Sequence, residues 1–111
     1  MRIGIDVMGG DHAPHPILEG ALVATAQLEA DDVVVLYGDE AIIAPAVASA
    51  NIGPASVEIV HTTESITMDE SPVDAVRSKQ DSSLVVMCKA GSKRADNPLD
   101  AVISAGNTGA F

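Results

Sequence analysis

Short apolar runs recur along the chain at intervals that predict strands separated by helices. Residues 33–37 are five consecutive apolar side chains, most of them β-branched, which is typical of a strand buried on both faces of a sheet. Shorter runs at Arg2–Asp6, Ser56–Val60 and Ala101–Ser104 predict three further strands.

Helical spacing of apolar residues fills the segments between these strands. The first predicted helix opens at Pro14 or Pro16 and places apolar side chains mostly on one face. The second has Asp39 as its N-cap, carries Pro45 inside or near its first turn, and runs to about Ala50. Two more are predicted: a short helix starting at Ser71–Pro72, and a helix from Leu84 to Ala90 capped by residues 81–83 and ended by Gly91.

Strands that alternate with helices predict βαβ units and therefore an α/β fold with a parallel sheet. In such sheets, ligands bind beyond the carboxyl ends of the strands. The segments expected at that edge are Asp6–His12, Gly38–Glu40, His61–Met68 and Ala105–Gly109.

Composition and charge narrow the class of protein. The chain has 111 residues, enough for one domain, and 47% of them are hydrophobic. Its net charge of −10 argues against a nucleic-acid partner. Cys88 is the single cysteine, no run reaches transmembrane length, and the N-terminus does not resemble a signal peptide, so a cytoplasmic location is expected.

The charge is divided unevenly along the chain. Residues 1–76 carry one basic and 13 acidic side chains, a balance of −12, whereas residues 77–111 carry five basic and three acidic ones, a balance of +2. Nearly all the positive charge lies between Arg77 and Arg94. This stretch is either a solvated helix face or a docking surface for an acidic partner.

Two glycine-rich turns follow two of the predicted strands. Gly9 and Gly10 lie between the first strand and the first helix, and Gly106-Asn107-Thr108-Gly109 follows the last strand. Glycine lets the backbone approach a ligand closely, and the second turn adds an amide and a hydroxyl. We expect the two turns to lie side by side and to hold an anion, bound by Gly9, Gly10, Asn107, Thr108 and Gly109.

The first turn also carries ionisable side chains. Asp6 is expected to orient loop N–H groups from the strand end, and Asp11 to cap the first helix. His12 is either a general acid or base or a solvated loop histidine. A metal site is disfavoured because no third protein ligand is evident. Cys88, within an apolar helix, is expected to be an inert buried thiol.

A second group of candidates precedes the last predicted helix. Arg77 and Lys79 come shortly before Ser82 and Ser83, and cations with hydroxyls at a helix start can bind an anion. The alternative is surface charge beside a serine cap. His61, directly after an apolar strand, is a further residue that could line a site.

Several motifs together resemble a known family. Ile5-Asp6-Val7-Met8-Gly9-Gly10-Asp11-His12-Ala13-Pro14 resembles the opening of the bacterial phosphate acyltransferases of phospholipid synthesis, the PlsX family. Further matches in the family's order are Tyr37-Gly38-Asp39-Glu40, Ala75-Val76-Arg77-Ser78-Lys79 with Asp81-Ser82-Ser83, and Ser104-Ala105-Gly106-Asn107-Thr108-Gly109-Ala110. The likeness covers the whole chain but only about the first third of a typical member, and a polar insertion at about residues 92–97 departs from the pattern.

The resemblance implies a function and a fold. Members transfer a fatty acyl group from acyl-carrier protein to inorganic phosphate, and the acyl phosphate feeds phospholipid synthesis. The implied fold is a three-layer α/β/α sandwich with a mostly parallel sheet, similar to phosphate acetyltransferases and isopropylmalate dehydrogenases, of which residues 1–111 would be an N-terminal, truncated portion. A homodimer, peripheral membrane association and no dissociable cofactor are also implied.

In this context the candidate residues take particular roles. Arg77 and Ser82 join the glycine turns as phosphate-binding candidates, while Lys79, Lys89, Lys93 and Arg94 become candidates for docking the acidic carrier protein. The catalytic base is not identified, with His12 and Asp11 as weak candidates.

Three alternatives compete with this interpretation. Ile3-Gly4-Ile5-Asp6 followed by Gly9-Gly10 also resembles the first phosphate loop of ATP-dependent sugar kinases, which continues into a second strand of a hairpin. A dinucleotide-binding domain is weaker, because no G-x-G-x-x-G motif is present. A non-catalytic fragment is the remaining alternative.

Overall fold

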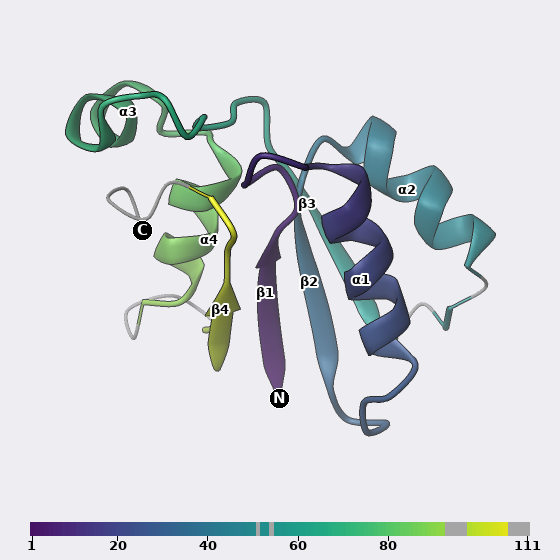
Figure 1. Cartoon of the computed structure of the whole chain (residues 1–111). Coiled ribbons are helices and arrows are strands. Elements are labelled where there is room, and N and C mark those ends of the chain that lie inside the picture. Colours follow the sequence, from purple (N-terminus) through teal and green to yellow (C-terminus); the bar gives the residue numbers. More distant parts are fainter. Residues whose placement is uncertain (51, 54, 93–97, 107–111) are drawn as a thin grey trace.

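The computed structural model describes residues 1–50, 52–53, 55–92 and 98–106. All four predicted strands and all four predicted helices are present in it (Figure 1). Their bounds are β1 (Arg2–Asp6), α1 (His15–Thr25), β2 (Val33–Gly38), α2 (Glu40–Ser49), β3 (Val57–His61), α3 (Pro72–Ser78), α4 (Ser83–Ala90) and β4 (Ala101–Ile103).

The described strands form one parallel sheet in the order β3-β2-β1-β4. Gly4 of β1 lies between Val35 of β2 and Val102 of β4. Because β2 runs parallel to β1, the chain does not return as the hairpin that the sugar-kinase alternative requires, and that alternative is wrong.

Helices cover both faces of the sheet, which confirms the three-layer α/β/α sandwich. α1 and α2 pack on one face and α4 on the other (Figure 1). β2 is central, and Val35 and Leu36 are fully buried on opposite faces, as its apolar run predicts. The first face buries Val7, Leu18, Ala21, Val34, Leu36, Ile43 and Val57; the second buries Val35, Tyr37, Ile66, Ala75, Leu84, Val85, Met87 and Leu99.

Three details of the predicted helices are corrected. Asp11 does not cap α1, because the Ala13 N–H donates to the Gly10 carbonyl in an intervening turn and Pro14 becomes the N-cap residue. Pro45 is the sixth residue of α2 rather than part of its first turn. Ser71 occupies the N-cap position of α3, but its side chain makes no capping hydrogen bond.

An ion pair crosses the sheet at the edge opposite the carboxyl ends of the strands. The Arg2 guanidinium donates to both carboxylate oxygens of Glu58 at 2.7 and 3.1 Å, reaching from β1 to β3 across β2. The hydrogen bond from Arg2 lowers the pKa of Glu58. Among the described residues, no helix is long and apolar enough to cross a bilayer.

Gly4 tests the packing of α4 on the sheet. A Cβ at this position would lie 2.5 Å from Leu99 Cδ1 and 3.1 Å from Met87 Cγ, both buried. We therefore expect Gly4→Ala to lower the free energy of unfolding by about 1–3 kcal/mol. Urea denaturation of the 111-residue chain measures this.

Gly20 provides the matched control. It lies within α1, and a Cβ there meets no atom within 4 Å. Gly20→Ala should raise the free energy of unfolding by roughly 0.5–1 kcal/mol, because alanine loses less backbone entropy in a helix. Equal effects of the two substitutions would contradict the packing described for Gly4.

Candidate functional site

The candidate site lies where the strand order changes direction. β1 and β4 are neighbours, although the chain first passes from β1 to β2 and β3 on the other side. In doubly wound sheets, the crevice at the carboxyl ends of two such strands is where ligands bind. Residues 7–10 and 104–106 follow these two strand ends, so the topology brings together two segments distant in sequence.

The two glycine turns lie side by side, as expected. A Cβ on Gly106 would be 3.3 Å from the Gly9 Cα, and one on Gly10 would be 3.1 Å from the Ala105 carbonyl oxygen. Gly10 has a φ of 104°, a conformation that L side chains rarely adopt. The described parts of both turns therefore need glycine, for close approach at Gly9 and Gly106 and for backbone conformation at Gly10.

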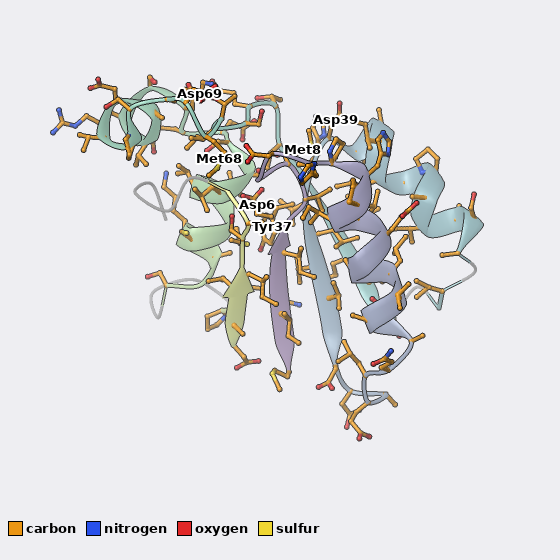
Figure 2. The ribbon with its side chains drawn as sticks, in the orientation of Figure 1. Asp6, Met8, Tyr37, Asp39, Met68 and Asp69 are labelled. Carbon is orange, nitrogen blue, oxygen red and sulfur yellow. The ribbon has the colours of Figure 1, made fainter. Side chains whose placement is uncertain are left out.

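The buried carboxylate of Asp6 connects the two glycine turns. Asp6, at the end of β1, is 2% exposed and accepts hydrogen bonds from the hydroxyls of Ser83 and Ser104. The Ser104 bond is 2.9 Å long, and the same hydroxyl accepts the Gly106 N–H at 3.0 Å. Figure 2 shows Asp6 at the strand end. Asp6 thus orients a loop N–H as predicted, but acts through Ser104.

The segment of residues 62–82 is joined to this network through the start of α4. Asp81 accepts the N–H and the hydroxyl of Thr63 at 2.9 and 2.5 Å, and these bonds lower the pKa of Asp81. Glu64 and Ser82 form a parallel bridge. Because Ser83 follows directly and donates to Asp6, hydrogen bonds connect the region after β3 with the turn after β4.

The candidate acid–base residues are accessible. Asp11 and His12 are both exposed in the turn that follows Gly10. Arg77 is exposed in the last turn of α3. Their catalytic and phosphate-binding roles remain predictions.

Other candidates have partners within the chain. Ser82 is fully buried and accepts the Val85 N–H as the N-cap of α4, so its hydroxyl serves the structural role that the sequence left as the alternative. Lys79 pairs with Glu70 at 2.7 Å and donates to the Ser65 carbonyl at 2.9 Å. Lys89 is exposed and donates to Gln80 at 2.8 Å.

Part of the predicted site lies outside the described residues. These positions are Asn107, Thr108 and Gly109 of the second turn, and Lys93 and Arg94 of the basic stretch. Their predicted roles in binding phosphate and carrier protein stay predictions.

Ser83 was predicted only as a hydroxyl of the second candidate anion site and Ser104 only as part of a family motif, and neither was expected to contact Asp6. Each is separated from Asp6 in the sequence, by 77 and 98 residues, so no local spacing connects them. Their positions at a helix start and a strand end, within two of the quoted motifs, were the available signals. Both donate hydrogen bonds to Asp6, a buried carboxylate at the switch point.

The structure also bears on two remaining possibilities, a nucleophilic cysteine and a metal site. Burial raises the pKa of Cys88, which disfavours the nucleophilic thiolate. Within the described ranges, no three His, Cys, Asp or Glu side chains are grouped so as to hold a metal ion.

Strand order, glycine turns and the buried carboxylate together define a doubly wound α/β protein whose strand order changes direction between β1 and β4. The model of the family described as "Fatty acid synthesis protein" matches residues 1–111. The chain belongs to this family, which confirms the resemblance drawn from its motifs.

Relatives of this chain carry a more specific name. A phosphate acyltransferase of Oceanobacillus iheyensis is 46% identical over 111 residues, covering 100% of this chain and 31% of the relative. Phosphate acyltransferases of Streptococcus suis and Caldicellulosiruptor saccharolyticus are 47% and 42% identical over 99% and 100% of the chain. The chain spans 30% and 32% of those two proteins, so it corresponds to about a third of each relative.

Asp6→Ala should destabilise the chain strongly, because it removes the shared acceptor of two buried or half-buried hydroxyls. We expect a loss of about 2–5 kcal/mol, since hydrogen bonds to a charged group contribute about 1.5–3 kcal/mol each. Asp6→Asn keeps the shape and one acceptor oxygen and should lose less. Urea denaturation of the chain provides the measurement.

Asp39→Ala is the comparison, because Asp39 only caps α2 through the Ala41 N–H. It should cost about 1 kcal/mol. If Asp6→Ala costs no more than Asp39→Ala, the Asp6 network is not the principal link between these segments.

Proposed function

We propose that this chain supplies the phosphate-binding part of an acyltransferase that forms acyl phosphate from acyl-carrier protein and inorganic phosphate. The observation that carries the proposal is the contact of two glycine turns at the switch point of the sheet. The relatives' name, phosphate acyltransferase, supports phosphate as the acceptor. The product would feed phospholipid synthesis.

The starts of the two neighbouring helices differ in a way that favours this location for an anion. α2 is capped by Asp39, and His61 accepts the N–H of Glu40, so its first donors are occupied. α1 has no side-chain cap and begins at His15, one short turn after Gly9-Gly10. The positive end of α1 and its turn are therefore the better place for phosphate oxygens.

The proposed reaction needs positioning more than a covalent enzyme intermediate. A phosphate oxygen attacks the thioester carbonyl, a C–O bond forms, the C–S bond breaks, and the thiolate leaves with a proton from an acid or water. Backbone N–H groups that hold phosphate and stabilise the oxyanion lower the barrier. Asp6 would hold the second turn in place through Ser104, and His12 and Asp11 stay weak candidates for proton transfer.

An acidic carrier protein is the proposed acyl donor, docked by the basic stretch. In its described part, Arg77 and Lys89 are exposed, whereas Lys79 is held by Glu70 and Ser65. Lys89 is therefore the better of the two lysines for a docking test. A homodimer, a cytoplasmic location with peripheral membrane association, and the absence of a dissociable cofactor belong to the same proposal.

The competing proposal is that residues 1–111 are a non-catalytic fragment. The exposed Ile103 of β4, with 55% of its surface accessible, favours the view that the chain functions only within a larger assembly. Both proposals predict that the isolated chain is inactive. They predict different results for a chimera in which the chain replaces the matching segment of the Oceanobacillus iheyensis relative.

The chimera should form acyl phosphate, whereas the 111-residue chain alone should not. Gly10→Ala in the chimera should reduce turnover by at least about tenfold, because the added Cβ crowds the Ala105 carbonyl at a φ of 104°. Acyl phosphate formation at varied phosphate concentration gives kcat and KM. Gly20→Ala is the control and should leave both unchanged.

An active isolated chain would contradict the inference, drawn from the exposed Ile103, that the chain functions only within a larger assembly. A Gly10→Ala chimera with unchanged kinetics in phosphate would remove the first turn from the phosphate site.

Carrier docking predicts a charge effect at Lys89. Lys89→Ala should weaken binding of acyl-carrier protein to the chimera by roughly two- to fivefold at low salt and less at high salt, because screening reduces exposed charge interactions. Gln27→Glu changes the net charge by the same amount at an exposed position after α1 and is the control. Calorimetric titration at two salt concentrations measures both, and equal affinities of the two variants would argue against docking at Lys89.

A further inference from the structure

A recess lies at the same sheet edge as the glycine turns. A cavity of about 310 Å³ is lined by Met8, Asp39, His61, Thr62, Thr63, Glu64 and Ser65. These residues follow the ends of β1, β2 and β3, and Figure 2 shows Met8 and Asp39 at that edge. Met8 directly precedes Gly9, so the cavity adjoins the first glycine turn.

One wall residue has an unused hydrogen-bonding group. Thr62 is 3% exposed, and its hydroxyl has no hydrogen-bond partner among the described residues. A buried hydroxyl without a partner destabilises the folded chain, because it loses its hydrogen bonds to water. Its backbone N–H donates to the Gly38 carbonyl at 2.9 Å, which holds the residue in place. An isosteric valine would fill the same space without an unpaired hydroxyl. The presence of threonine at this position therefore points to a ligand that uses the hydroxyl.

The charges around the cavity exclude a phosphate. Asp39 and Glu64 contribute carboxylates, and no lysine or arginine is among the seven lining residues. The first N–H groups of α2 are occupied by His61 and Asp39. Since His61 accepts through Nδ1, its neutral ring carries a proton on Nε2 as a remaining donor. The lining therefore suits a neutral ligand with both hydrogen-bond donors and acceptors.

We propose that this cavity binds the neutral, amide- and hydroxyl-bearing arm that carries the acyl thioester in the donor. The assignment rests on the proposed function, in which the acyl group arrives on a carrier protein. β3 and β1 are two strand spacings apart, roughly 10 Å. An arm seated beside Thr62 and Met8 would lead its thioester toward the glycine turns. Because less than 1 Å² of the Thr62 hydroxyl oxygen is accessible, an amide of the arm would pair with it after a χ1 rotation that turns the hydroxyl to the cavity.

Pantetheine, a neutral diamide, is the probe for binding. Titrated into the isotope-labelled 111-residue chain, it should shift the amide resonances of residues 62–65 and of Glu40. Thr62→Val should weaken this binding about three- to tenfold, the effect of one hydrogen bond, and Thr62→Ser should retain it. Thr25→Val is the matched control, because Thr25 is a buried threonine of α1 that donates to the Ala21 carbonyl.

Stability supplies a second, opposite readout. Thr62→Val should raise the Tm by about 4 °C or more, because it removes an unpaired buried hydroxyl, whereas Thr25→Val should not raise it. A threonine with a purely structural role would lose stability on the same change. A lower Tm for Thr62→Val would show that the hydroxyl has a partner in the protein, and this result would overturn the proposal.

The chimera separates failure of this site from failure of the proposed function. Thr62→Val should raise the KM for the acyl donor about three- to tenfold and leave the KM for phosphate unchanged. Pantetheine shifts at residues 62–65 that Thr62→Val weakens support the site even where the chimera forms no acyl phosphate. An active chimera whose donor KM ignores Thr62→Val, or pantetheine shifts confined to other residues, overturns it.

Discussion

The buried carboxylate of Asp6 is the interaction on which the candidate site depends. A carboxylate removed from water requires hydrogen-bond donors, and here they come from two distant segments, Ser83 at the start of α4 and Ser104 after β4. The carboxylate also occupies the space beside Gly9, where a Cβ would lie 2.3 Å from Oδ2. One side chain therefore sets the relative positions of α4 and both glycine turns.

The same sheet edge offers two chemically different environments. At β1 and β4, the glycine turns and the start of α1, which has no side-chain cap, form the site that we propose for an anion. Beyond β2 and β3, capping by Asp39 and His61 removes backbone donors, and the lining becomes acidic and neutral-polar. This difference supports the proposal that the phosphate acceptor and the long neutral part of the acyl donor bind at adjacent places on the sheet edge.

The basic stretch of the sequence is divided between structure and surface. Lys79 is held by Glu70 and Ser65 within the 62–82 segment, and its bond lowers the pKa of Glu70. Its charge is thus partly neutralised inside the chain, whereas Arg77 and Lys89 remain exposed. Clustering of charge in the sequence therefore overstated the part of this stretch that is available to a partner.

The sequence by itself determined the elements, the α/β class, the family and the use of glycine at two strand ends, because these depend on local periodicity, turn chemistry and short motifs. Local patterns do not determine strand order or contacts between residues far apart. Only the tertiary structure decided that β1 and β4 are neighbours, that Asp6 is bound by Ser83 and Ser104, and that Ser82 is a buried cap. It also decided that the Thr62 hydroxyl is buried without a partner in the described part of the chain, since burial depends on how β3, α2 and the 62–82 segment pack together.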